Sequence, residues 1–117
     1  MHRDESRTDL GTIKIHKKVI ASISSLAAAE IEGVKRVGGD LKSGLLELIG
    51  KRFLSAINVE INKNEEVSVK IPLVIKYGYN IPEVASKVQD NIHNSLEKMT
   101  NLSIKDININ VQGIERG

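Results

Sequence analysis

The stretch of sequence that decides the fold is LVIKYGYNIPEV, residues 73–84. Before it, hydrophobic and polar residues alternate, as in a strand with one buried face; the inward positions are Val67, Val69, Ile71, Leu73, Ile75 and Tyr77. After it, apolar residues recur at steps of four and three, which predicts a helix with one buried stripe; the stripe is Val84, Val88, Ile92, Leu96 and Met99. A strand therefore enters this junction and a long helix leaves it.

The junction itself carries the signals of a helix start. Gly78 suits a turn conformation that residues with a β-carbon avoid. Asn80 occupies the N-cap position, Glu83 follows three residues later as in a capping box, and Pro82 falls in the first turn, where its missing N–H costs little. We interpret Gly78, Asn80, Pro82 and Glu83 as a structural junction. Tyr77 is expected to close the core, and Tyr79 to be an exposed contact residue.

Composition describes one small globular domain with an aliphatic core. The chain has 117 residues, of which 40% are hydrophobic and only 3% aromatic. It has no cysteine, which excludes disulfides, thiolate zinc sites and cysteine nucleophiles. The net charge of +2 is too small to indicate nucleic acid by itself. No apolar run approaches the roughly 20 residues of a membrane span, and the polar N-terminus does not resemble a signal peptide, so we expect a cytoplasmic protein.

Taken in order, the chain predicts a tail at 1–10, one domain at 11–114 and a tail at 115–117. Within the domain we expect a strand at 12–15, a helix at 17–32, an irregular segment at 34–52, an antiparallel hairpin of strands at 55–61 and 67–77, the helix to residue 100, and a last strand at 104–112. The stripe of the first helix is predicted to be Val19, Ile23, Leu26, Ala27 and Ile31, with Gly33 as its stop.

This order is βαββαβ, which predicts a two-layer α+β domain with both helices on one face of a mostly antiparallel, four-stranded sheet. The order matches the ferredoxin-like arrangement. Pro72 disagrees with that arrangement, because proline belongs on an edge strand or at a bulge and this strand would be central. Either a bulge lies at Pro72 or the strand order differs.

The assembled motifs resemble a known family. They are GTIKI at 11–15, EIEGV at 30–34, VIKYGYNIPEVA at 74–85, MTNL at 99–102 and INVQG at 109–113. In this order they resemble the alkaline shock protein (Gls-type general stress protein) family of Gram-positive bacteria, over roughly residues 11–114. The resemblance implies a cytoplasmic stress-response protein with no known catalysis. It also implies a role at the cell envelope, with a membrane-anchored protein partner at the inner face of the membrane, self-association, or both. Other members of the family are connected to fatty-acid metabolism.

The segment 35–52 holds the excess positive charge, five basic against two acidic residues, beside a run of leucines. Adjacent leucines cannot all face one core stripe. One interpretation is a short helix that closes the core; another is a docking surface for a protein partner or an anionic membrane. We take as the candidate contact surface, for a partner or a second copy, Leu45, Leu46, Leu48, Ile49, Lys51 and Arg52, together with Tyr79.

No motif indicates catalysis, a metal or a cofactor. His2, His16 and His93 lack metal-ligand spacing, and the chain has no nucleophile elbow and no phosphate-binding glycine loop. The βαββαβ order also occurs in RNA-binding domains, which stack bases on sheet aromatics. Here the outer sheet face is expected to carry amides and charges instead, so we expect no nucleic-acid partner. The alternative function is a small RNA- or ligand-binding regulator that uses the basic middle segment.

Overall fold

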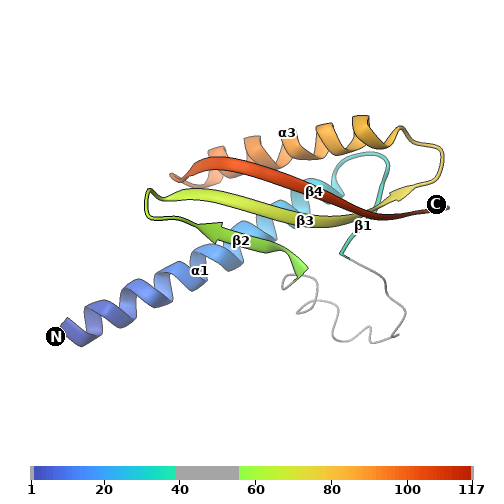
Figure 1. The fold of residues 1–117 in the computed structure, drawn as a ribbon. Coiled ribbons are helices and arrows are strands. Elements are labelled where there is room, and N and C mark those ends of the chain that lie inside the picture. The colour runs from blue at the N-terminus through green and yellow to red at the C-terminus, as the bar shows by residue number, and fades with distance from the viewer. Residues whose placement is uncertain (1, 39–55, 117) are drawn as a thin grey trace.

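The computed structural model describes the backbone of residues 2–38 and 56–116, and the side chains of residues 16–38 and 56–116. The elements in these ranges are, in order, α1 (His2–Ala29), β1 (Val34–Val37), β2 (Asn58–Ile61), β3 (Glu66–Lys76), α3 (Ile81–Met99) and β4 (Ser103–Glu115). Figure 1 shows both helices on one side of a twisted sheet. The predicted two-layer α+β class is therefore confirmed.

Strand β3 is the centre of the sheet. Strand β4 runs parallel to it along its whole length, from Glu66↔Ser103 to Lys76↔Glu115. Strands β2 and β1 are antiparallel to β3 and pair with residues 67–70 and 73–75 respectively. Because β4 occupies one edge of β3, the two short strands share the other edge end to end. The predicted hairpin of β2 and β3 is confirmed, whereas α3 is a crossover between the parallel strands β3 and β4.

This arrangement explains the proline in the central strand. The Pro72 carbonyl accepts a hydrogen bond of 2.8 Å from the Gly38 N–H, so the backbone polar positions of Pro72 point toward the edge that β1 and β2 share. On that edge β2 pairs as far as Lys70, and β1 begins to pair at Leu73. The nitrogen of Pro72 therefore faces the gap between two strands, where no ladder hydrogen bond is lost. A strand order different from the ferredoxin-like one accounts for Pro72.

The first predicted strand is wrong. Residues 12–15 lie within α1, which begins at His2, so residues 2–10 of the predicted tail are also helical. The strand that completes the sheet is instead Val34–Val37, inside the segment predicted to be irregular. Its register shifts between Val34 and Arg36, which leaves Lys35 as a bulge and breaks the alternation that would reveal a strand. Both edges of β3 are occupied by β1, β2 and β4, so no place beside β3 remains for residues 12–15.

The core lies between the sheet and the two helices. Val84, Val88, Ile92 and Leu96 of α3 are buried, as predicted, and each contributes roughly 1.5–3 kcal/mol through burial. Met99, expected at the end of the same stripe, is exposed. On α1 the buried stripe is rotated from the predicted one: Ile20, Ser24, Ala27 and Ala28 face inward, and Val19 and Leu26 are exposed. The small residues allow α1 to lie close to α3, where the Asn91 amide donates to the Ala27 carbonyl at 2.7 Å.

Candidate contact surfaces

The strand-to-helix junction contains an N-capped helix start. Gly78 has a φ of +96°, in the region that favours glycine. The Glu83 backbone N–H donates to Asn80 Oδ1 at 3.0 Å, so Asn80 is the N-cap, and Pro82 lies in the first turn. The Glu83 carboxylate lies 3.3 Å from Lys87 Nζ, one turn along the helix. The polar groups of this junction therefore serve the helix start.

Tyr79 joins two connections that are far apart in sequence. Its hydroxyl donates to Glu32 Oε2 at 3.0 Å, and its ring lies against Gly33. A β-carbon added at Gly33 would lie 2.8 Å from the ring, so the contact requires glycine there. The hydrogen bond to Glu32, helped by partial desolvation and by the charge of Glu32, raises the pKa of Tyr79 above its usual value. Tyr79 is 37% exposed, and its role in docking a partner stays a prediction.

The prediction that Tyr77 closes the core is wrong. Its side chain is 68% exposed, and Arg116 Cζ lies 5.6 Å from the centroid of its ring. Strand β3 ends at Lys76, and the Tyr77 N–H donates to the Glu115 carbonyl at 2.7 Å. The strand alternation that would turn this ring inward therefore stops one residue before it.

An ion pair that the sequence analysis missed bridges the sheet at the same end. The Arg36 guanidinium donates from both terminal nitrogens to the Glu115 carboxylate, at 2.6 and 2.7 Å. Arg36 is in register with Val74 and Glu115 with Lys76, so the pair spans β3 on the face away from the helices. These bonds lower the pKa of the Glu115 carboxyl below its usual value. No local signal could predict a contact between residues 79 positions apart.

A cleft of about 390 Å³ lies at the opposite end, where α1 leaves the domain. It is bounded by the middle of α1, the β2–β3 turn and the segment that follows α3; its lining residues are His16, Val19, Ile20, Glu65, Met99, Thr100, Asn101 and Leu102. Two apolar side chains of this lining are exposed, Val19 to 42% and Met99 to 68%. Exposed apolar residues gathered around a cleft are typical of contact sites.

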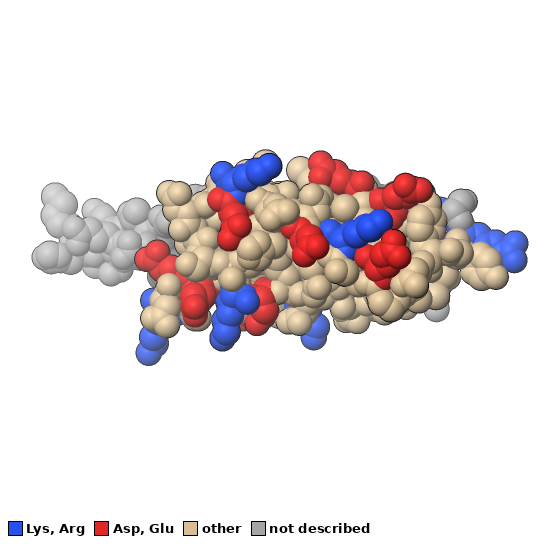
Figure 2. Space-filling model, turned by 90° about the horizontal axis from the view of Figure 1, so that it is seen from above, with Lys and Arg blue, Asp and Glu red and all other residues tan. Residues whose placement is uncertain are grey.

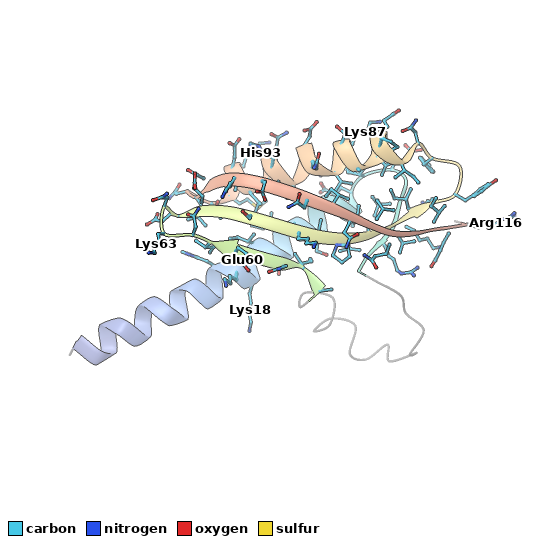
Figure 3. All side chains as sticks on the ribbon, viewed as in Figure 1. Lys18, Glu60, Lys63, Lys87, His93 and Arg116 are labelled. Atoms are coloured by element: carbon cyan, nitrogen blue, oxygen red, sulfur yellow. The ribbon has the colours of Figure 1, made fainter. Side chains whose placement is uncertain are left out.

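The outer face of the sheet is polar, as predicted. Exposed amides and charges line it: Asn58, Glu60, Lys70, Asn108, Asn110 and Gln112. Figure 3 shows Glu60 of β2 near the hairpin end that carries Lys63, and Lys87 and His93 on the side of α3 away from the sheet. Among the described side chains seen in Figure 2, over α3, acidic and basic groups are interspersed.

The segment predicted as a contact surface lies outside the described residues: Leu45, Leu46, Leu48, Ile49, Lys51 and Arg52. In the described part of the chain, no three His, Cys, Asp or Glu residues come together as metal ligands. His93 Nδ1 lies 3.6 Å from Glu97 Oε1 in an exposed pair along α3, one turn apart. No helix among the described residues is both long and apolar enough to cross a membrane.

Comparison with known proteins places the chain in a family. Residues 5–116 match the model of the alkaline shock protein 23 family, which is described as having a cell envelope-related function. The chain is 35% identical to uncharacterized protein YqhY of Bacillus subtilis over 113 residues, which cover 96% of this chain and 83% of the relative. It is 30% identical to uncharacterized protein YloU of the same organism, over 94% of this chain and 93% of the relative.

A third relative, uncharacterized protein Spy1535 of Streptococcus pyogenes, is 24% identical over 90% of this chain and 80% of the relative. No solved structure matches the chain significantly. The family match spans α1 from residue 5, the whole sheet and α3, including the YGYNIPE junction at residues 77–83. The chain therefore belongs to the alkaline shock protein family, whose function is related to the cell envelope.

Proposed function

We propose that this protein is a non-enzymatic stress-response scaffold of the cell envelope that works through protein contact. Its partner in this proposal is a membrane-anchored protein, which holds it at the inner face of the membrane. Membership of the alkaline shock protein family supports the connection to the envelope. The observation that carries the proposed mechanism is the cleft beside α1, because it combines exposed apolar side chains with a concave surface.

The cleft has the features of a site for an apolar side chain of a partner. Val19 comes from α1, and Met99 from the last turn of α3, so two elements that pack against each other supply its rim. A methionine adapts its shape to different apolar surfaces. Polar groups surround the apolar part, including Glu65 and Asn101. This is the pattern of an apolar centre with a polar rim that protein interfaces show.

A paired substitution tests this mechanism. We expect Val19→Ser combined with Met99→Ser to raise the apparent dissociation constant of the protein for membranes, measured by sedimentation, by about tenfold or more, which corresponds to about 1.4 kcal/mol of contact energy. Leu26→Ser is the matched control: Leu26 is an exposed apolar residue of the same helix but does not line the cleft. Thermal melting of all variants verifies that each one folds.

The partner is identified by a photo-crosslinker placed at Met99 in living cells. Crosslinking to a protein with a membrane-spanning segment supports the proposal. Equal sedimentation of the double variant and the control contradicts it, and so does membrane sedimentation that nuclease treatment abolishes, since the contact would then run through RNA.

A further inference from the structure

The edge of β4 that faces away from β3 has no strand beside it in the described parts of the chain. Strand β4 is 13 residues long, and β3 pairs with only one of its edges. Figure 1 shows β4 at one margin of the sheet and β2 at the other. A long unpaired edge offers a row of backbone N–H and C=O groups to another strand. The margin formed by β1 and β2 does not offer such a long row of backbone groups, because each of those strands has only four residues and a gap separates them.

The hydrogen bonds identify which residues of β4 present their backbone groups at this edge. Gln89 Nε2 of α3 donates to the Ile107 carbonyl at 2.8 Å, so this carbonyl points away from β3. The register is continuous from Asp106 to Val111, between two irregularities. Because backbone groups alternate between the two edges of a strand, those of Ile109 and Val111 also point outward.

We propose that β4 pairs antiparallel with β4 of a second copy, with the two-fold axis at Ile109. The strand is self-complementary about this residue, so a second copy of the chain can pair with it. In this register Ile109 lies opposite Ile109 of the second copy, and Ile107 lies opposite Val111 of the second copy. All of these side chains are on the core face of β4, so the pairing places the apolar faces of the two sheets on the same side.

The outer face matches equally well. Asn108 lies opposite Asn110 of the second copy, within the part of β4 whose register is continuous. No charged residue lies between Ile107 and Val111, so no two like charges meet directly across this part of the interface. Opposed like charges destabilise a strand pair, and matched polar pairs stabilise it. The result is one continuous sheet of two subunits with the described helices of each subunit, α1 and α3, on one face.

This inference goes beyond the proposed membrane partner, since it concerns a different surface and needs only purified protein. It is tested with two double variants that differ at one position. N108E/N110E places carboxylates opposite each other across the two-fold axis, whereas N108E/N110K places a carboxylate opposite an ammonium. Position 108 is in register with Lys70 of the same chain and position 110 with Pro72, and both face outward, so the subunit fold tolerates the changes.

Sedimentation velocity over a range of protein concentrations gives the dimer dissociation constant. We expect the wild-type protein to dimerise, N108E/N110E to raise the dissociation constant at least tenfold, and N108E/N110K to return it to within about threefold of the wild-type value. Hydrogen exchange at the Ile109 amide should slow as the protein concentration rises.

Three results would overturn the proposal: a wild-type protein that stays monomeric, equal dimerisation of the two double variants, or equal weakening of both. The Val19→Ser and Met99→Ser protein separates this inference from the proposed function. It is expected to lose membrane sedimentation and still dimerise, so either idea can fail without the other.

Discussion

At the scale of single residues, the end of the domain that contains Tyr79 depends on one glycine. Gly33 combines a φ of +102° with a close approach to the Tyr79 ring and to Val84 Cγ2. Its carbonyl also accepts a hydrogen bond of 2.7 Å from the Lys76 N–H. Gly33 therefore lets the connection between α1 and β1 pass directly beneath Tyr79. The sequence marks Gly33 only as a helix stop, and the ring above it is known only from the structure.

Alanine substitutions at two glycines separate backbone strain from this packing. Gly78 has a similar φ of +96°, but a β-carbon there would meet nothing within 4 Å. We expect Gly78→Ala to cost about 1–2 kcal/mol, from the unfavourable backbone conformation alone. Gly33→Ala adds overpacking to that strain and should cost about 2–4 kcal/mol. Urea unfolding measures both, and equal losses would contradict the close packing of Tyr79 on Gly33.

The raised pKa of Tyr79 predicts a pH effect on the alkaline side. The chain has two tyrosines, so Tyr77→Phe leaves Tyr79 as its single phenol. We expect its absorbance titration to have a midpoint above the ordinary value of 10.0, because Glu32 accepts a hydrogen bond from the protonated hydroxyl and repels the phenolate. Glu32→Gln should move the midpoint back toward 10.0; an unchanged midpoint would contradict the contact.

The sign of the linked stability follows from the direction of this shift. The folded state holds the phenol proton more tightly than the unfolded chain does. The contribution of the hydrogen bond to folding is therefore complete below the ordinary pKa and is lost as the pH rises through the raised pKa of the folded state.

At the scale of elements, α1 is held to the rest of the domain by small residues. Ser24 is fully buried on its inner stripe, and its Oγ has no hydrogen-bond partner among the described residues. A buried hydroxyl without a partner costs free energy, and alanine is also the stronger helix former. The size of this side chain, and not its polarity, is therefore what the packing of α1 requires.

Two substitutions of Ser24 should have opposite effects. We expect Ser24→Ala to leave the free energy of unfolding unchanged or to raise it by up to about 1 kcal/mol. Ser24→Leu should lower it by about 1–3 kcal/mol, because the larger side chain overpacks a closely packed site. Thermal unfolding measures both. A destabilised Ser24→Ala protein would show that the hydroxyl has a partner in solution.

At the scale of the whole molecule, the shape is elongated. The Cα radius of gyration is 15.5 Å, against about 13 Å for a compact chain of similar length. Figure 1 shows the cause: the first half of α1 extends past the end of the sheet. The buried part of the helix begins near Ile20, which is 1% exposed. The fold is therefore expected to depend on the second half of α1 and not on the first.

Stepwise deletion at the N-terminus tests this division. Removal of residues 2–12 should change the melting temperature by less than about 4 °C, since that part of α1 extends past the sheet. Removal of residues 2–20 takes Ile20 from the core and should abolish cooperative unfolding. A large loss of stability on the shorter deletion would show that the projecting half packs against the domain.

Most of the architecture is predictable from local sequence patterns, because hydrophobic periodicity and helix capping depend on residues that are close together in the sequence. Residues a few positions apart in the sequence are enough to predict the buried stripe from Val84 to Leu96 and the N-cap at Asn80. The same is true of the strand alternation of Ile107, Ile109 and Val111. The same holds for the hairpin of β2 and β3. Of the candidate contact residues, Tyr79 is the one that the structure describes, and its partners Glu32 and Gly33 lie more than forty positions away.

The sequence by itself determined the α+β class, the junction at which α3 begins and the resemblance that the family match confirms. Only the tertiary structure decided that residues 12–15 are helical, that Val34–Val37 is a strand and that β3 has β4 beside it in parallel. The physical reason is that an edge of β3 can be filled only once. Which segment fills it depends on contacts between distant parts of the chain, and local propensity does not contain that information.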